Sequence, residues 1–273
     1  MVIMVAALGG AYFAYRVVFP HRAYDTLPPQ LPADLHDPAI LVFSKTNGYR
    51  HKDAIPAAND ALAEIARQRG WSIYFTENGA VFNSTDLGRF QAAVWNNTSG
   101  DVLNARQKQA FRTYIENGGG FVGIHGAGGD PRYVWRWYVE TLIGAQFKGH
   151  TLFPHFPRAT IHIEEPNDPA MKGLPRDWVR NDEWYSFEQS PRENGAEVLA
   201  TLNEETYKPK MAWRNIAMGS DHPIIWKHCV GKGRAFYSAI GHSASAYQEP
   251  LHLKELTGAI AWAAGLEGEN CGG

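Results

Sequence analysis

The sequence predicts an α/β domain built on a mostly parallel β-sheet. Short apolar runs alternate with stretches of helical periodicity from residue 39 to residue 124, and such alternation is typical of a parallel sheet with helices on both faces. The 273 residues fit one large domain of this kind. Ligands of parallel sheets bind beyond the carboxyl ends of the strands, so the loops that follow the strands are the expected site.

Clear sequence signals predict the first strands and the first helix. Residues 39–43 form an unbroken apolar run between turn signals, which predicts a buried strand. Apolar residues at helical spacing predict a helix over residues 54–69, and Gly70 closes it. Further strands are expected at residues 71–76 and 92–95.

The next helix and strand have their own signals. Asn104 and Gln107 have the spacing of a capping box at the start of a helix that runs to residue 117. Glycines 118–120 end that helix, and no Walker lysine accompanies them, so they do not indicate a phosphate loop. A fourth strand is expected at residues 121–124. Later strands are expected at residues 159–163, 197–202, 223–227 and 234–238, with a closing helix at 251–264.

Composition excludes several classes of protein. With 26 Lys and Arg against 28 Asp and Glu, the formal net charge is −2, which argues against a nucleic-acid partner. The two cysteines exclude a disulfide-rich scaffold and a four-thiolate zinc site. Aromatic residues make up 12% of the chain and there are 11 histidines, residue types that serve in sugar clefts and site chemistry as well as in cores.

The first 38 residues are expected to lie outside the fold. Residues 1–19 are almost uncharged and read as a signal peptide or a membrane anchor. Residues 20–38 are rich in proline and are predicted to form a semi-rigid linker. The basic residues after the apolar run would leave the domain in the cytoplasm by the positive-inside rule. We nevertheless expect export to the periplasm or the outside of the cell. One domain is predicted over residues 39–267, followed by a tail at residues 268–273.

The two cysteines allow two interpretations. One is a buried thiol at Cys229 and a second thiol in a frayed tail at Cys271. The other is a disulfide that ties the tail to the strand around Cys229, which would require an oxidising compartment and would agree with export.

His125 is the most informative single residue. It follows the fourth strand, in the run Gly123-Ile124-His125-Gly126-Ala127. Small residues around a functional one at a strand end are the pattern of a nucleophile elbow. An imidazole there can act as base, acid or metal ligand, but it seldom serves as an acyl nucleophile. We therefore expect His125 to be catalytic.

Glu183 and His242 complete the predicted catalytic set. Glu183 follows Asp182 and precedes Trp184, and an apolar neighbour could raise the pKa of its carboxyl group. His242 comes shortly after a predicted strand. No tight metal-binding spacing such as HExxH is present. A divalent metal held by His125, Glu183 and His242 remains compatible with the sequence, and no other cofactor is indicated.

Eight stretches together resemble the trehalose-utilisation (ThuA-like) family, over roughly residues 39–265. They are residues 43–51, 97–103, 118–125, 135–138, 147–150, 182–185, 221–224 and 241–242.

This resemblance implies a flavodoxin-like three-layer sandwich of the class I glutamine amidotransferase-like superfamily, with His125 at the position where the amidotransferases carry cysteine. It also implies disaccharide or glycoside metabolism, with 3-keto sugars supplied by a partner oxidoreductase. Exported members of the family look similar around Cys229 and Cys271, which favours the disulfide.

These expectations combine in one hypothesis: acid/base elimination and hydration of a 3-keto-glycoside. A base removes the acidified C–H next to the ketone while an acid helps the glycosidic oxygen to leave. The alternative is a non-catalytic carbohydrate-binding module, and a glutaminase is disfavoured because neither cysteine sits at an elbow. The predicted substrate-binding residues are Arg50, His51, Asn97, His150, Trp184, Tyr185 and Trp226.

Overall fold

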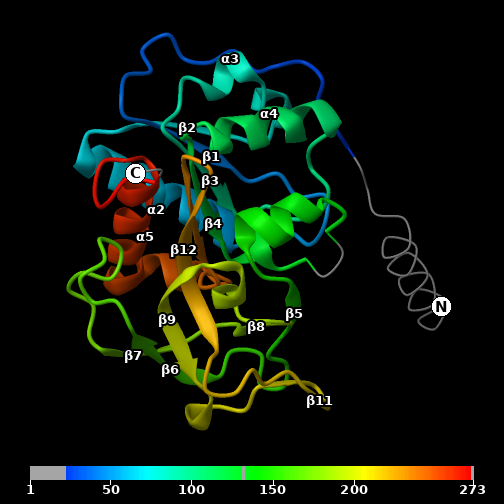
Figure 1. Cartoon of the computed structure of the whole chain (residues 1–273), viewed down its shortest axis with the longest axis vertical. Coiled ribbons are helices and arrows are strands. Elements are labelled where there is room, and N and C mark those ends of the chain that lie inside the picture. The colour runs from blue at the N-terminus through cyan, green and yellow to red at the C-terminus, as the bar shows by residue number, and fades with distance from the viewer. Residues whose placement is uncertain (1–22, 131–132, 272–273) are drawn as a thin grey trace, which may run out of the picture.

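The computed structural model describes residues 23–130 and 133–271. Within these ranges one nine-stranded sheet has the order β2-β1-β3-β4-β13-β12-β9-β6-β7 (Figure 1). The first five strands in this order run parallel, and the other four continue the sheet as antiparallel neighbours. The strands of the sheet are β1 (Ala39–Phe43), β2 (Ser72–Thr76), β3 (Ala92–Asn96), β4 (Gly120–Ile124), β6 (Arg158–Ile163), β7 (Asp177–Asn181), β9 (Glu197–Asn203), β12 (Pro223–Val230) and β13 (Gly233–Ser238).

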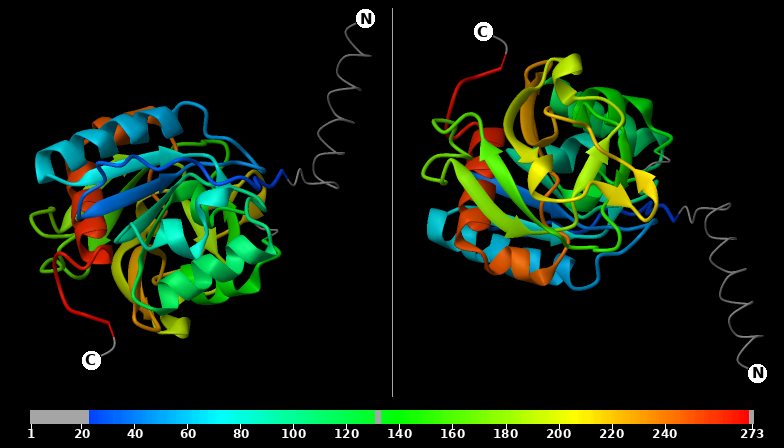
Figure 2. Two further views of the ribbon diagram at one scale, coloured as in Figure 1. Left: turned by 90° about the horizontal axis from the view of Figure 1, so that it is seen from above. Right: turned by 90° about the horizontal axis from the view of Figure 1, so that it is seen from below.

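Helices cover both faces of the parallel half of the sheet (Figure 2). Helices α2 (Ala54–Arg69) and α5 (Pro250–Ala263) lie on one face. The other face carries α3 (Ser84–Leu87), α4 (Ala105–Glu116) and a π-helical turn at Tyr138–Ile143. The chain is thus an α/β protein with a large mixed sheet, and its apolar core runs along both faces of that sheet.

The sequence signals for the first half are confirmed. Helix α2 has the predicted bounds, and Gly70 closes it in the left-handed conformation at φ 69°. The capping box of α4 is present, with Asn104 and Gln107 bonded reciprocally. The sequence missed two small pairs of strands and one edge strand: β5 (Phe147–His150) with β8 (Tyr185–Phe187), β10 (Lys210–Met211) with β11 (Arg214–Asn215), and β7.

The described part of the predicted linker, residues 23–38, makes contacts with the domain. Tyr24 donates a hydrogen bond to Asp101 at 2.7 Å, and Asp25 accepts one from the backbone of Gly79 at 2.8 Å. Leu31 and Leu35 pack on the core. These polar and apolar contacts hold the linker residues against the domain. Proline content alone predicts only that the linker is extended.

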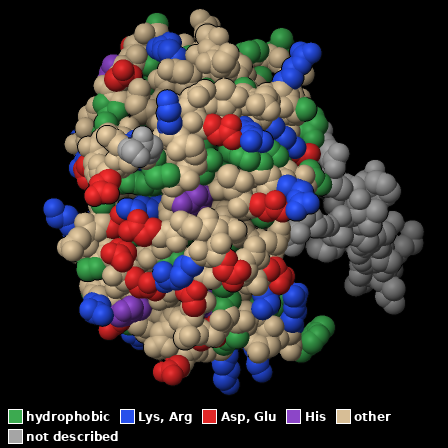
Figure 3. Space-filling view, in the orientation of Figure 1, with side chains coloured by type: hydrophobic (Ala, Val, Ile, Leu, Met, Phe, Trp, Pro, Cys, Tyr) green, Lys and Arg blue, Asp and Glu red, His purple; other side chains and the backbone are tan. Residues whose placement is uncertain are grey.

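The predicted signal peptide or anchor, residues 1–19, lies outside the described residues. Among the helices that the structure describes, none is both long and apolar enough to cross a bilayer. Both signs of charge are interspersed over the face seen in Figure 3, in keeping with the formal net charge of −2.

Of the two interpretations of the cysteines, the structure supports the disulfide. Cys229, on β12, is bonded to Cys271 across 42 residues of sequence, with their Cα atoms 5.5 Å apart. The chain has two cysteines in all, so neither is a free thiol in this structure.

Candidate functional site

Two adjacent parallel strands end in strained residues. Asn97 follows β3 with φ 51°, and His125 follows β4 with φ 44°, a region that residues other than glycine seldom adopt. Hydrogen bonds hold both in place: Tyr247 accepts one from the Asn97 amide at 3.1 Å, and Tyr237 donates one to the His125 carbonyl at 2.8 Å. Strain of this kind is typical of functional sites, and at His125 it matches the elbow that the sequence predicts.

Three side-chain atoms form a nearly regular triangle beyond these strand ends. His125 Nε2 lies 3.2 Å from His242 Nδ1 and 3.3 Å from Glu183 Oε2. His242 Nδ1 lies 2.9 Å from the same carboxylate oxygen. The three residues come from three separate loops, so only the tertiary fold brings them together.

Hydrogen bonding between neutral rings does not explain this triangle. His125 Nδ1 lies 2.7 Å from the carbonyl oxygen of Ala239, to which it must donate. In a neutral ring Nε2 then carries a lone pair, so the edge to Glu183 joins two acceptors. A proton on His125 Nε2 would turn this edge into a hydrogen bond, and a metal cation would satisfy all three atoms at once.

His51 adds a fourth imidazole to the cluster. Its ring packs edge-on against His125 and His242, at centroid distances of 4.9 and 4.8 Å. Burial first, and then the charge of His125 and His242, lowers the pKa of His51 to about 2. Its Nδ1 is buried and has no hydrogen-bond partner among the described residues. A neutral, unpaired imidazole nitrogen beside two other imidazoles is suited to bind a metal ion.

The second oxygen of Glu183 faces two further histidines. His150 Nδ1 lies 3.0 Å from Glu183 Oε1, and His155 Nε2 contacts the same oxygen. Burial alone would raise the pKa of Glu183, but hydrogen bonds and charge from His125 and His242 lower it below its ordinary value. This corrects the expectation of a raised pKa, because the neighbours that decide it are imidazoles and not the indole of Trp184.

Asp182 positions the loop that carries His242. Its carboxylate accepts hydrogen bonds from the backbone N–H groups of Gly241 at 3.0 Å and His242 at 3.2 Å. Arg180 donates to the same carboxylate at 3.1 Å. Only Glu183 of this acid pair faces the ligand cluster, and Asp182 holds the backbone behind it.

A cavity of about 550 Å³ opens in front of the cluster; we call it the metal cavity. His51, Glu183 and His242 line it, together with the partly exposed His150 and His155. Tyr185 also lines it, and its ring covers the fully buried His125 at a centroid distance of 4.2 Å. His125 therefore faces the ligand cluster, and it is not among the residues that line the open cavity.

Four predicted substrate-binding residues do not line the metal cavity. Trp184 and Trp226 are fully buried, and their indole N–H groups donate to the backbone oxygens of Pro157 and Ile143. Arg50 forms an ion pair with Glu77. Asn97 is buried behind the cavity, where it accepts a hydrogen bond from the Gly126 backbone at 3.3 Å. Both tryptophans are therefore part of the hydrophobic core.

Sequence reasoning missed His155 and Asp182. His155 lies five residues after His150, and this spacing is not a recognised metal-binding motif. Asp182 was visible only as the neighbour of Glu183. The segment between β5 and β6 brings His155 to Glu183. The contact therefore depends on a turn that the sequence pattern does not predict.

Comparison with solved structures supports the fold. A ThuA-like protein from Bacteroides uniformis ATCC 8492 is 24% identical, with a TM-score of 0.72 over 86% of this chain and 95% of that one. A ThuA-like protein from Parabacteroides merdae ATCC 43184 is 19% identical, with a TM-score of 0.62 over 83% and 89%. A β-galactosidase from Rahnella sp. R3 is 14% identical, with a TM-score of 0.54 over 85% of this chain and 32% of that one.

The comparison with curated proteins gave no match. The family model described as ThuA, trehalose utilisation, matches residues 39–263. These residues hold the whole sheet, the triangle and the closing helix. The chain therefore belongs to the ThuA family, a family of trehalose utilisation.

Proposed function

We propose that this protein is a metal-dependent enzyme that acts on a glycoside, with a 3-keto-glycoside as the expected substrate. The triangle of His125, Glu183 and His242 is the observation that carries the proposal. Its edges measure 2.9, 3.2 and 3.3 Å. Ligands about 2.1 Å from a metal ion lie about 3.0 Å apart at 90° and about 3.4 Å apart at a tetrahedral angle, so the triangle has the dimensions of one face of a metal site.

The donor set also fits a divalent transition metal. Two imidazoles and one carboxylate on one face, with open positions beyond, form a common metal-binding arrangement. His51 belongs to the same group of possible ligands, so one of its ring nitrogens would supply a fourth. A metal held there would polarise the ketone of a bound sugar.

The remaining residues of the metal cavity are placed for proton transfer. His150 and His155 are partly exposed and contact Glu183, so they are suited to exchange protons with a bound sugar and with water. One of them would remove the C2 proton next to a 3-keto group, and the other would protonate the departing glycosidic oxygen. Water would then add to the unsaturated sugar, which completes a net hydrolysis. Acid/base groups of this kind contribute about 10²–10⁴-fold to a rate.

We further propose the flavodoxin-like arrangement of the class I glutamine amidotransferase superfamily. The order of the parallel strands supports it, since β2-β1-β3-β4-β13 corresponds to the 2-1-3-4-5 order of that fold. Glutaminase chemistry needs a thiolate, and both cysteines are bonded to each other.

Export and a partner oxidoreductase complete the proposal. The disulfide supports an oxidising compartment, where such bonds persist. A 3-keto substrate requires a reaction that first oxidises the sugar at C3, so an oxidoreductase of glycosides would supply it.

The test is turnover of 3-keto-glycosides, followed by sugar analysis, together with the metal content of the purified protein. His242→Ala should lose both the metal and the turnover. His155→Ala should keep the metal and lose turnover by about 10²-fold or more. The matched control is His162→Ala, since His162 pairs with Asp177 outside the metal cavity. Full turnover by His242→Ala or by chelator-treated protein would refute the proposal.

A further inference from the structure

The two carboxylate oxygens of Glu183 face different imidazoles. Oε2 belongs to the triangle with His125 and His242. Oε1 lies 3.0 Å from His150 Nδ1 and also contacts His155 Nε2. We call His150, His155 and Glu183 the outer group. Their donor atoms lie within 4.8 Å of one another, so a small adjustment of the partly exposed rings would bring all three to one ion.

The chain holds both outer histidines at the metal cavity. His150 ends β5, and the pairing of β5 with β8 sets it opposite Tyr185. The carbonyl oxygen of His155 accepts a hydrogen bond of 2.9 Å from the Thr151 hydroxyl group. The Phe156 ring stacks on the His155 ring at 4.2 Å. The two histidine side chains are nevertheless 30% and 37% exposed, so an ion can reach them directly from solvent.

The outer group should bind a metal more weakly than the ligand cluster behind it. It offers three donors, whereas the cluster of His51, His125, Glu183 and His242 offers four. His150 Nδ1 also lies 3.0 Å from the carbonyl oxygen of Thr151, and a proton shared with that oxygen must leave before a metal binds. Two divalent cations joined by one carboxylate also repel each other. The inner cluster should therefore fill first.

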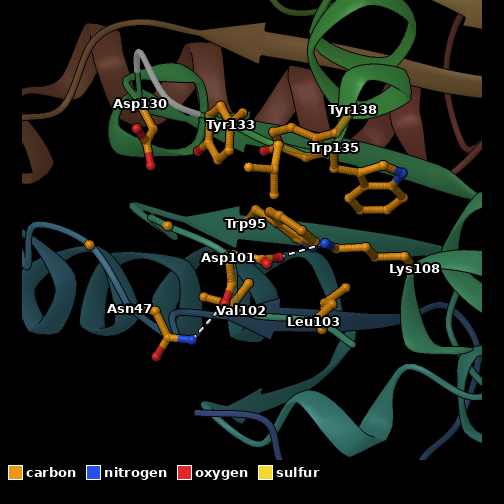
Figure 4. A pocket seen from close by; sticks show the side chains of 13 residues that line it. Asn47, Trp95, Asp101, Val102, Leu103, Lys108, Asp130, Tyr133, Trp135 and Tyr138 are labelled. Atoms are coloured by element: carbon orange, nitrogen blue, oxygen red, sulfur yellow. Dashed lines mark hydrogen bonds and ion pairs between the residues drawn. The ribbon is translucent and has the colours of Figure 1, made fainter. Parts of the chain in front are cut away.

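The neighbouring pocket is lined differently. It has a volume of about 100 Å³ and shares Gly48 and Asp130 with the metal cavity. No histidine is among the described residues that line it. Figure 4 shows Asp101 beside Lys108, and the ammonium group of Lys108 lies 2.5 Å from the Asp101 carboxylate. A cation of the protein already pairs with that carboxylate, so the outer group is the stronger candidate for a second ion.

We propose that the outer group is a second, inhibitory site for a divalent transition metal. Imidazole nitrogens and a carboxylate oxygen are ligands that suit Zn²⁺. A metal there would coordinate His150 and His155, the two residues that we assign to proton transfer. A coordinated ring nitrogen has no lone pair left to take a proton, so turnover should fall while the inner metal stays bound. The inference rests on the proposed function and adds its regulation by metal concentration.

The first measurement is a calorimetric titration of the full chain with Zn²⁺. The wild type should show two classes of site, with one ion in each and the second class weaker. His155→Ala should keep the first class and weaken the second about tenfold or more, since even the loss of a group that only supports a ligand costs about 10–100-fold. His150→Ala should do the same, and it is an independent variant in case the first one misfolds.

The matched control is His162→Ala, which should keep both classes of site. His162 is also a partly exposed ring that pairs with a carboxylate, that of Asp177. Among the described residues this pair has no third donor close enough to complete a metal site. The comparison therefore separates the outer group from an ordinary surface pair of histidine and carboxylate.

Turnover supplies the second measurement. On protein that already holds one equivalent of Zn²⁺, further Zn²⁺ should reduce turnover of the 3-keto-glycoside about tenfold or more. The midpoint of this inhibition should equal the Kd of the second class of site. The same concentration of Mg²⁺ should not inhibit, because Mg²⁺ prefers oxygen ligands. His162→Ala should be inhibited like the wild type.

Three results would count against the inference. A single class of site in the wild type, or a second class that both His150→Ala and His155→Ala leave unchanged, would overturn the second site and leave the inner cluster standing. The two histidines would then only form hydrogen bonds with Glu183. Turnover that holds or rises while the second class fills would overturn the inhibitory role. Absence of the first class would instead contradict the proposed function.

Discussion

Asp182 binds the backbone of His242, while the next residue in the chain binds its side chain. The Asp182 carboxylate lies 3.2 Å from the His242 backbone nitrogen, and Glu183 Oε2 lies 2.9 Å from its ring Nδ1. Two consecutive acids therefore fix one histidine in both position and orientation. In the metal site that we propose, Asp182 would support one of the ligands, and the loss of such a supporting group typically lowers metal affinity about 10–100-fold.

Asp182→Asn should lower the metal affinity about 10–100-fold. The amide keeps one acceptor oxygen, but the Asp182 carboxylate accepts hydrogen bonds from three backbone N–H groups, those of Glu183, Gly241 and His242, and from the Arg180 guanidinium. Competition with a chelator of known affinity measures the effect. Asp177→Asn, at an exposed position on β7, is the control, and an equal loss in both variants would show that Asp182 has no special role.

Metal binding should raise the melting temperature in a concentration-dependent way. A ligand that binds only the folded state stabilises it by about 2.7 kcal/mol at a hundredfold excess over its Kd. His51→Ala should reduce this gain, because the variant removes one ligand of the cluster. Thermal unfolding with and without added Zn²⁺ or Mn²⁺ checks the prediction. An identical metal response in His51→Ala and wild type would remove His51 from the site.

Loss of the disulfide should destabilise the domain. The bond between Cys229 and Cys271 closes a loop with a sequence separation of 42 residues, so Cys271→Ser should cost about 2–4 kcal/mol of unfolding free energy. Denaturant unfolding with and without reductant measures it. Reductant should lower the stability of the wild type to that of the variant and leave the variant unchanged.

The Glu204 carboxylate should stabilise the fold at neutral pH and not in acid. It accepts hydrogen bonds from the backbone of Met218 at 2.7 Å and Gly219 at 3.1 Å, and it contacts His222 Nδ1 at 2.6 Å. Burial opposes ionisation, but these donors lower the pKa of Glu204 overall. Its contribution is therefore complete above the carboxyl pKa of the unfolded chain, about 4.3, and is lost as the pH falls through the lower pKa of the folded state.

The variant Glu204→Gln tests this predicted pH dependence of the stability. The variant should lose about 1–2 kcal/mol at pH 7, and the difference from wild type should shrink as the pH falls below about 4. Glu205→Gln, in the same turn, is the control. A difference that stays constant from pH 7 to pH 3 would contradict the assignment.

The sequence determined the parallel half of the sheet and the position of His125. Apolar runs, helix caps and Gly70 are local signals, and they suffice for β1 to β4, each of which pairs with another of these four strands. They also placed His125 at a strand end. Local signals did not reveal that Trp184 and Trp226 are buried. An aromatic side chain suits a core and a sugar cleft equally well, so its location depends on which other elements pack over it.

Tertiary structure alone decided the ligand cluster. His51, His125, His155, Glu183 and His242 come from loops spread over almost 200 residues, and no spacing between them carries a metal signature. Their atoms meet because parallel strands end at one edge of the sheet and because the β5–β8 pair brings a later segment across that edge. A sequence records the order of residues along the chain, whereas coordination depends on distances across it.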